Sequence, residues 1–160
     1  MYLVLEPSRF MRSTAAGFTL IETLIVVALV AILAGVSAPI VAGGMARYNL
    51  TTAGQQVAST MRSARFQAVG RNTPVRVVLD AGAGTYEREA RDPITALWES
   101  ISEAALLPSG VTIADGAPAN IEFRSDGRLF VAVATSIVLT DEYDQTRTIT
   151  VQPNGRIQLQ

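Results

Sequence analysis

Residues 17–40 read GFTLIETLIVVALVAILAGVSAPI, and the rest of the chain is organised around this stretch. From Thr23 to Ala46 there is no charged side chain over about 24 residues, which is long enough for a helix to cross a bilayer. Glu22 places one carboxylate at the N-terminal edge of the apolar run. A charge at the edge of an apolar helix is costly and usually functional. We therefore predict a membrane-spanning helix in which Glu22 has a specific role.

The motif Gly17-Phe18-Thr19-Leu20-Ile21-Glu22 closely resembles the N-terminus of type IV pilins and type II secretion pseudopilins. The resemblance implies that a prepilin peptidase cuts between Gly17 and Phe18 and methylates the new amine of Phe18. It also implies that Glu22 pairs with the N-terminal amine of a neighbouring subunit, since two opposite charges in lipid are better paired than alone. For Glu22 the alternative is an acid that merely points to the headgroups. For the whole segment the alternative is a secretory signal peptide or a simple anchor. A signal peptide has a shorter apolar core, with its small-residue cleavage site after that core.

Charge around the apolar run predicts the orientation of the chain. Arg9 and Arg12 precede the run, so the positive-inside rule places them in the cytoplasm and the rest of the chain in the periplasm or beyond. A leader of the usual short length would start at Met11 rather than at Met1. The sequence therefore divides into a cleaved leader, a transmembrane and assembly helix, and a periplasmic pilin-like domain, at residues 1–17, 18–46 and 47–160.

Beyond the apolar run, apolar side chains recur at intervals of three and four, which predicts an amphipathic helix over residues 47–70. This stripe consists of Leu50, Ala53, Val57, Met61, Ala64 and Ala68. Gly70 and Pro74 are expected to end the helix. Earlier in the helix, Gly35 and Pro39 predict a kink or a locally melted stretch, because proline removes a backbone hydrogen bond and its ring collides with the preceding turn. In the resembled family this region loosens during filament packing; a tolerated membrane kink is the alternative.

After Pro74 the pattern changes from helix to strands, because β-branched residues dominate and turn signals such as Asp-Gly and Asn-Gly recur. Strands are predicted at residues 75–80, 85–89, 111–113, 121–124, 129–140, 147–152 and 156–159, with an irregular segment at 91–110. One long helix followed by a meander of antiparallel strands is an α+β fold, with the helix packed on the sheet.

The last half of the chain, β-rich over residues 75–160, together with the helix end before it, also resembles the GspH/FimT family of minor pilins and pseudopilins. The shared features are Ala68-Val69-Gly70-Arg71-Asn72 at the helix end, Trp98, Leu107-Pro108-Ser109-Gly110-Val111, Phe123-Arg124-Ser125-Asp126-Gly127-Arg128, and the turn Asn154-Gly155-Arg156. The two resemblances together imply the pilin fold, in which a long N-terminal helix spans the membrane with its first half and packs on an antiparallel sheet with its second half.

The composition excludes several classes of catalytic and cofactor site. The chain has 13 basic residues, all of them arginine, 14 acidic residues, and no cysteine or histidine. It cannot form a disulfide framework, a Cys/His zinc site or a Ser-His-Asp triad. We therefore expect a protein that is not an enzyme and that has no catalytic residue, metal or cofactor. A membrane-anchored periplasmic enzyme without these residues is the alternative.

Arg124, Arg128, Arg147 and Arg156 lie at or beside predicted strand ends and could converge into a DNA-binding patch. Some fimbrial members of the resembled family bind DNA through a basic C-terminal tail, whereas here no further charge follows Arg156. A single arginine releases few counterions, so DNA is not expected as a partner. Arginines at strand ends are otherwise ordinary solubilising residues.

Two further groups of residues have ordinary structural explanations. Asp141, Glu142 and Asp144 could hold calcium, which prefers clustered oxygens, but no Asp-x-Asp-x-Asp-Gly loop with a closing glutamate is present. A solvated hairpin tip is expected there. Trp98 is expected to anchor the core or a loop rather than to bind a ligand.

The resemblance implies a minor pseudopilin, a structural subunit that assembles through its N-terminal helix into a type II secretion pseudopilus. The alternative is a minor subunit of a type IV pilus that serves pilus biogenesis or DNA uptake; the missing basic tail favours the pseudopilus. The implied partners are the prepilin peptidase, the other pilins or pseudopilins of the filament, the inner-membrane assembly platform and membrane lipid. The implied location is the bacterial inner membrane with the C-terminal domain in the periplasm, and then the periplasmic pseudopilus or a cell-surface pilus. Because Glu22 is present, the extreme tip position, whose subunit lacks this acid in related systems, is not expected.

Overall fold

The computed structural model describes residues 17–160, without the side chains of residues 36–40. Most of the predicted leader, residues 1–16, lies outside the described part. One helix of 52 residues, α1 (Leu20–Arg71), is followed only by strands. The chain divides into two compact units, Met1–Ala38 and Pro39–Gln160. The helix assignment continues without a break through Gly35 and Pro39, so the structure contains no melted stretch there, and the kink remains a prediction.

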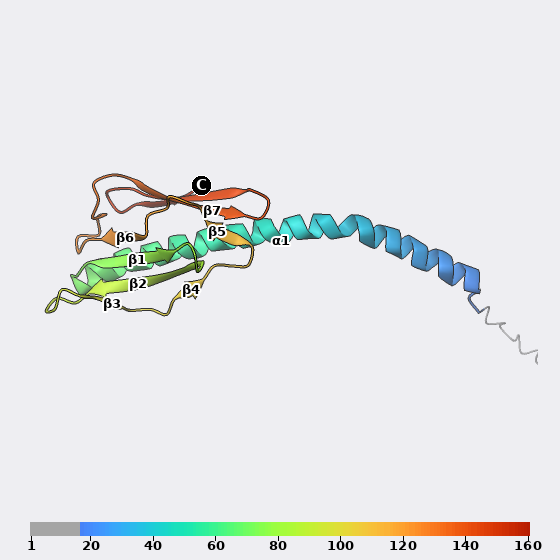
Figure 1. The fold of residues 1–160 in the computed structure, drawn as a ribbon, viewed down its shortest axis with the longest axis horizontal. Coiled ribbons are helices and arrows are strands. Elements are labelled where there is room, and N and C mark those ends of the chain that lie inside the picture. The colour runs from blue at the N-terminus through green and yellow to red at the C-terminus, as the bar shows by residue number, and fades with distance from the viewer. Residues whose placement is uncertain (1–16) are drawn as a thin grey trace, which may run out of the picture. The chain divides into compact units, whose positions relative to one another are not determined.

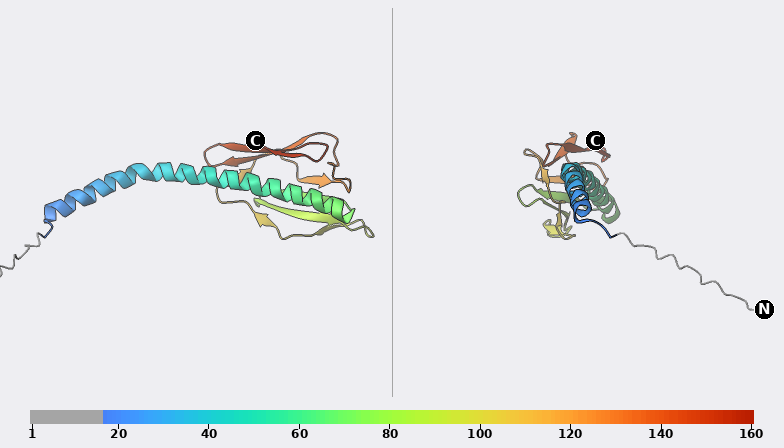
Figure 2. Two further views of the ribbon diagram at one scale, coloured as in Figure 1. Left: turned by 180° about the vertical axis from the view of Figure 1, so that it is seen from behind. Right: turned by 90° about the vertical axis from the view of Figure 1, so that its right-hand side faces the viewer.

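The strands form two antiparallel sheets, shown in Figure 1. Sheet A has the order β3-β2-β1-β6, with β4 also paired to β2, and sheet B has the order β5-β7-β8-β9. The bounds are β1 Val75–Asp80, β2 Thr85–Arg91, β3 Trp98–Ser100, β4 Ala105–Leu106, β5 Val111–Ile113, β6 Asn120–Phe123, β7 Thr135–Asp141, β8 Thr146–Val151 and β9 Ile157–Leu159. In Figure 1 and in the left view of Figure 2, the second half of α1 lies along both sheets.

The α+β class and the helix-on-sheet arrangement are confirmed, but the strands do not form a single meander. β1 pairs with β6, so that Val75 lies opposite Phe123, and β5 pairs with β7 rather than with its sequence neighbour β6. Because β6 joins β1 and β5 joins β7, the strands form two sheets instead of one. Each sheet buries one face, and both buried faces pack on the same helix. Sheet B is itself a meander from β7 to β9.

Two strand predictions were wrong in detail. Residues 129–140 were expected to form one strand, but β7 begins only at Thr135, and Leu129 makes a single isolated bridge to Phe123. Phe130, Val131 and Val133 between them are exposed. Strand propensity reflects packing against neighbours, and in the described residues this segment pairs with β6 only at its start, where the N–H of Phe130 donates to the carbonyl of Glu122 at 2.9 Å. The segment 91–110, expected to be irregular, contains β3 and β4, which form by pairing with β2.

One hydrophobic core joins the second half of α1 to both sheets. All six residues of the predicted stripe are buried, from Leu50 to Ala68, together with Ala58. The sheets contribute large side chains that are also inaccessible to solvent: Val75, Val77 and Phe123 from sheet A, and Ile137, Leu139, Ile149 and Val151 from sheet B. Small residues on the helix therefore face branched and aromatic residues on the strands, which allows close packing.

The C-terminus of α1 is closed by Asn72 rather than by Gly70. Asn72 adopts a left-handed conformation with φ 51°, which asparagine tolerates better than most residues. Its N–H donates to the carbonyl of Val69 at 3.2 Å, and the N–H of Thr73 donates to that of Ala68 at 3.2 Å. These two bonds form a Schellman motif, which satisfies carbonyls that the helix leaves unpaired. The helix end was therefore predicted in the correct place but assigned to the wrong residue.

Two hairpin tips meet over one arginine of α1. The Nε of Arg65 donates to the carbonyl oxygen of Gly127 at 2.9 Å. Gly155 also packs here with φ 79°, and a Cβ added to it would overlap the Gly127 oxygen. The tips around Gly127 and Gly155 are joined by a bond from the N–H of Leu129 to the carbonyl of Pro153 at 3.1 Å. We call this contact the Arg65 junction: Arg65, Gly127 and Gly155.

We predict that a fragment starting at Val41 unfolds cooperatively, because Pro39–Gln160 is a compact unit with its own core. A fragment starting at Asn49 should be less stable by about 1 kcal/mol, since it lacks buried Ala46 and the 3.2 Å bond from Arg47 Nε to Gln145 Oε1. Urea unfolding followed by circular dichroism measures both fragments. A disordered Val41 fragment would show that the domain depends on the preceding residues.

At the Arg65 junction, Gly155→Ala should reduce the free energy of unfolding by roughly 3 kcal/mol or more, because strain at positive φ is joined by an overlap with backbone. Gly84→Ala is the matched control: its φ is 65°, but nothing lies within 4 Å of the added methyl. The control should cost only about 1 kcal/mol. Equal losses in urea unfolding would show that the close approach of the two tips is not a determinant of stability.

Candidate functional site

The beginning of α1 holds the candidate processing and assembly residues. Gly17, Phe18 and Thr19 precede the helix, and Phe18 is 84% exposed. The Oγ1 of Thr19 accepts a hydrogen bond from the N–H of Glu22 at 3.3 Å, so Thr19 is the N-cap residue. The bond between Gly17 and Phe18 therefore lies outside the helix.

Glu22 lies in the first turn of α1, and its side chain is exposed. A carboxylate in this position interacts favourably with the partial positive charge of the helix N-terminus, by about 0.3–1 kcal/mol. The same position would bring the carboxylate close to any cation at the start of a neighbouring helix. The single chain thus provides a local role for the Glu22 carboxylate, in its interaction with the dipole of its own helix, and leaves its side chain exposed.

Apolar side chains cover every side of α1 between Leu20 and Leu33. Leu24, Val27 and Ile32 are 59%, 64% and 64% exposed, for example. A helix that is apolar all round requires an apolar environment, supplied by lipid or by other helices. Across the described residues, however, no helix meets the combined requirements of length and hydropathy that identify a membrane-spanning segment.

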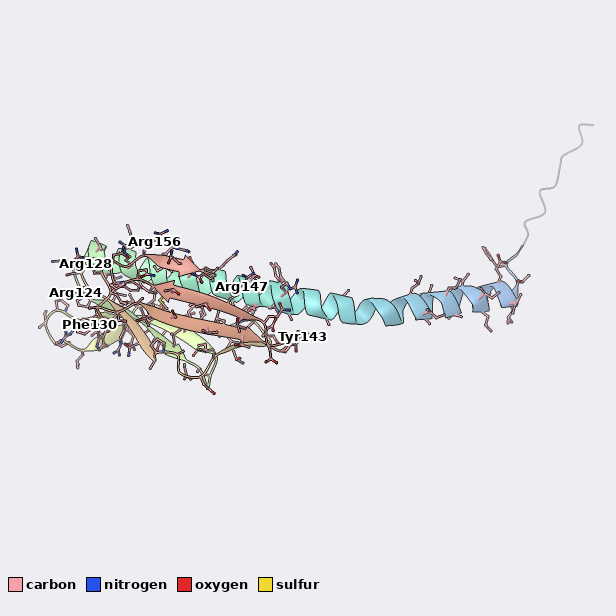
Figure 3. All side chains as sticks on the ribbon, turned by 90° about the horizontal axis from the view of Figure 1, so that it is seen from above. Arg124, Arg128, Phe130, Tyr143, Arg147 and Arg156 are labelled. Atoms are coloured by element: carbon pink, nitrogen blue, oxygen red, sulfur yellow. The ribbon has the colours of Figure 1, made fainter. Side chains whose placement is uncertain are left out.

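Of the four candidate arginines in the β-rich part, the structure brings three together. Arg124 and Arg128 lie in one hairpin tip, where the N–H of Arg124 donates to the carbonyl of Arg128 at 2.8 Å. Arg156 lies in the other tip of the Arg65 junction, and Figure 3 shows all three at the same end of the domain. Arg147 lies apart from them on β8, half-buried against Gly54 of α1. Of the four arginines that could converge, Arg147 therefore lies outside the group.

Arg65 completes this group and was not identified as a site residue from the sequence. The apolar periodicity of α1 assigns Arg65 only to a face other than the buried one. The signals were the two Gly-Arg turns downstream, Gly127-Arg128 and Gly155-Arg156. Both glycines adopt a positive φ, and a Cβ added to either would lie within 3.4 Å of the Arg65 side chain. We refer to Arg65, Arg124, Arg128 and Arg156 as the arginine cluster. The ion pair found among residues 17–160 is Arg76–Glu89. In these residues, no carboxylate lies within 4.0 Å of any guanidinium of the arginine cluster.

An exposed apolar surface adjoins the arginine cluster. Phe66 and Val69 of α1 are 78% and 51% exposed, and with Arg62 and Arg65 they line a shallow pocket of about 390 Å³. Phe130, which follows the first tip, is 64% exposed. Cationic and aromatic side chains side by side can bind an acidic protein surface or a nucleic acid.

The acidic residues 141–144 form the tip of the hairpin between β7 and β8. Asp141 is 6% exposed, and its Oδ1 accepts bonds from the N–H groups of Tyr143 and Gln145, each at 2.9 Å. Asp144 adopts φ 58°, as a tight loop of this kind requires. Within the described part of the chain, no three acidic side chains are grouped so as to hold a metal ion. The geometry is that of a hairpin tip stabilised by Asp141.

Trp98 lies on the solvent side of sheet A rather than in the core. The guanidinium of Arg76 stacks on its ring at 4.3 Å from the centroid, and the Nε of Arg76 pairs with Glu89 at 2.6 Å. Burial raises the pKa of the neighbouring Glu122, and the Arg91 and Arg76 guanidiniums lower it in part. Such a stacked and paired group stabilises the sheet surface.

Comparison with known proteins identifies two matching family models. The model of type II transport protein GspH matches residues 53–155, which is more than half of the chain. The model of the prokaryotic N-terminal methylation motif matches residues 12–38, which include the Gly17–Glu22 motif. Among curated proteins, type II secretion system protein H of Xanthomonas campestris pv. campestris is 34% identical over 87 residues. That alignment covers 52% of this chain and 52% of the relative, so the chain spans about half of its length.

Solved structures with the same fold include two minor subunits. The type IV minor pilin FimU of Pseudomonas aeruginosa superposes with a TM-score of 0.60 at 16% identity, over 71% of this chain and 90% of that one. The minor pseudopilin EpsH of the Vibrio cholerae type 2 secretion system superposes with a TM-score of 0.57 at 14% identity, over 70% and 96%. At these identities the superpositions establish the pilin fold, and the family match is more specific. The chain belongs to the GspH family of type II transport proteins and carries its methylation motif at the start of α1.

Proposed function

We propose that this chain is a minor pseudopilin, a structural subunit without catalysis that assembles through its N-terminal helix into a type II secretion pseudopilus. The observation that carries the proposal is the combination, in one chain, of the methylation motif at residues 12–38 and a GspH-family domain at residues 53–155. The half-length match to type II secretion system protein H supports the same machine. The likeness to FimU, which would favour a type IV pilus, concerns the fold alone.

In this proposal a prepilin peptidase removes residues 1–17 and methylates Phe18. The apolar half of α1 anchors the subunit in the inner membrane, and residues 47–160 lie in the periplasm. Support comes from the two leader arginines, which favour the cytoplasm, and from the uncharged run Thr23–Ala46. In the filament, the apolar side chains that are exposed in the single chain contact the helices of other pseudopilins, after delivery by the inner-membrane assembly platform.

Glu22 has a defined role in this assembly. Cleavage before Phe18 creates a positive amine at the end of a helix whose dipole disfavours it. In an apolar environment that amine needs an opposite charge, and the Glu22 carboxylate of the adjacent subunit supplies it. The pairing selects the depth at which two helices meet, because any other depth leaves both charges unpaired.

The processing step predicts that the mature protein begins with N-methylphenylalanine at Phe18. Mass spectrometry of the protein purified from cells with an active prepilin peptidase measures this directly. Gly17→Ala should slow cleavage, because the added methyl must fit the peptidase site. Cells that lack the peptidase are the control and should retain the leader. An intact leader in cells that contain the peptidase would contradict the proposal.

For assembly, Glu22→Ala should reduce co-purification with partner pseudopilins by at least about tenfold, because it leaves the neighbouring Phe18 amine unpaired in an apolar environment. Glu22→Gln should be nearly as harmful, since it keeps the shape and removes the charge. Membrane insertion should be unaffected by either change.

Thr19→Ala is the matched control for a purely local role of Glu22. It removes the Oγ1 acceptor that caps α1 and leaves the carboxylate in place. If charge pairing matters, Thr19→Ala should assemble much better than either Glu22 variant. If all three variants assemble as well as the wild type, Glu22 is only an acid at the helix end.

A further inference from the structure

The C-terminal end of α1 carries exposed basic and apolar side chains. Phe66 and Val69 are 78% and 51% exposed, and with Arg62 and Arg65 they line a shallow pocket of about 390 Å³. Phe130 is 64% exposed, and Figure 3 shows it at the same end of the domain as the three arginines of the hairpin tips. We call this the basic–apolar surface: the arginine cluster together with Arg62, Phe66, Val69 and Phe130.

The pocket and the two hairpin tips form one continuous surface. A Cβ added to Gly127 would lie 3.0 Å from Val69 Cγ2, so the first tip contacts the wall of the pocket. A Cβ added to Gly155 would lie 2.7 Å from Arg65 Nε, so the second tip contacts the same arginine. That nitrogen donates to the Gly127 carbonyl at 2.9 Å. Arg65 is thus held in place before any partner binds, which lowers the entropy that binding costs.

The surface is strongly positive. It contains Arg62 and the four residues of the arginine cluster, and among residues 17–160 none of these guanidiniums has a carboxylate within 4.0 Å. Asp126 is the acid in the first tip, and its Oδ1 accepts the backbone N–H of Arg128 at 3.0 Å. The whole chain has 13 basic and 14 acidic residues, so the excess of positive charge is local to this surface. Charge complementarity therefore favours an acidic partner.

The pocket favours a protein partner over a nucleic acid. Bases stack on flat aromatic faces. This pocket is lined instead by one ring, one aliphatic side chain and two arginines, which suits an apolar side chain bordered by carboxylates. Arginine and aromatic residues are also the groups that most often dominate the binding energy of protein interfaces.

We propose that the basic–apolar surface docks on an acidic surface of a different pseudopilin in the same filament, where carboxylates surround an apolar side chain. The inference rests on the proposed function, because a minor subunit has other pseudopilins as its neighbours. A second copy of this chain is a less favourable occupant. A two-fold contact through this surface would place two arginine clusters against each other, and like charges at an interface are unfavourable.

This contact would select which pseudopilin lies beside the subunit. Between Leu20 and Leu33, α1 exposes apolar side chains on every side, and one apolar helix packs on another without a charge that distinguishes them. A charged surface does distinguish its partners, because a neighbour without matching carboxylates leaves the arginines unpaired in the interface. The apolar half of α1 then provides assembly, and the basic–apolar surface provides the choice of neighbour.

Photo-cross-linking in the full chain tests the contact. Phe66 is replaced by benzoylphenylalanine, which keeps an aromatic ring at the pocket, and the chain is expressed with the other pseudopilins of the same organism, each with its own tag. Irradiation of the membranes should join this chain to one of them, and mass spectrometry should find acidic residues beside the joined site. Tyr143 is the matched control position, since it is 50% exposed at the other end of the domain in Figure 3, and it should give little of this product.

Charge reversal tests the electrostatic part of the contact. Arg128→Glu should reduce the cross-linked product by about tenfold, because it places an acid against the acidic partner. Arg47→Glu is the matched control, since Arg47 is also exposed and the change in charge is the same, but its Nε contacts Gln145 at the other end of the domain. The control should leave the product nearly unchanged. An arginine in place of the acid identified on the partner should restore the product of the Arg128→Glu chain.

Four results would overturn the contact: no product with any tagged pseudopilin, equal product from the Tyr143 position, equal effects of Arg128→Glu and Arg47→Glu, or a joined site without acidic residues. A product between two copies of this chain would also overturn it, and so would loss of the product on nuclease treatment, which would assign the arginines to nucleic acid.

The same membranes are analysed for N-methylated Phe18 and for co-purifying pseudopilins, which separates this inference from the proposed function. If both are present and the cross-link at Phe66 is missing, the docking contact alone is wrong. If both are missing too, the proposed function is wrong.

Discussion

The fold depends on one packing constraint: the buried side of the second half of α1 is lined by small residues. Ala53, Ala58, Ala64 and Ala68 have no accessible surface, and Val57 and Met61 are the larger groups between them. Because alanine keeps the helix surface close to the backbone, two sheets can approach the same helix and interdigitate their valine, isoleucine and phenylalanine side chains. A larger residue at an alanine position would force both sheets outward, since cores are packed too densely to absorb the added volume. The Arg65 junction lies on the same stretch of helix, since Arg65 follows buried Ala64 directly.

Much of the fold could be predicted from local patterns. The strands Val75–Asp80 and Val111–Ile113 have the predicted bounds, and the Asp-Gly and Asn-Gly turns lie where the hairpins close. The failures have a common physical cause, because strand identity depends on a partner elsewhere in the chain. Phe130–Val133 has high strand propensity but, among the described residues, forms no ladder beyond the bond from the Phe130 N–H to the Glu122 carbonyl, while Ala105–Leu106 is a strand because it lies beside Thr85 and Tyr86. The pairing of β1 with β6, which makes two sheets out of one expected meander, has no local signal at all.

The candidate site was predictable to a different degree in each of its parts. The motif Gly17–Glu22 is short and specific, so its position on an N-capped apolar helix follows from the residues themselves. The arginines of the strand ends were recognised as a group, but their sorting depends on tertiary structure: Arg128 and Arg156 belong to touching tips, whereas Arg147 faces α1. Arg65 could not be found by periodicity, because its contact is a polar one with a carbonyl 62 positions later. Trp98 shows the same limit, since only the paired strands place it on Arg76.

The Arg65 junction has a consequence for the order in which the domain is completed during synthesis. Sheet A can begin to form once β1 and β2 exist, since these strands are joined by a tight turn. Arg65, in contrast, gains its carbonyl partner only when Gly127 has been made, and the cover over that contact arrives still later, with Gly155. The helix is thus among the first elements to emerge and among the last to be fully enclosed. A product truncated before the final hairpin would leave Arg65 and the neighbouring core open to solvent. Quality-control proteases could then cleave the unfinished chain.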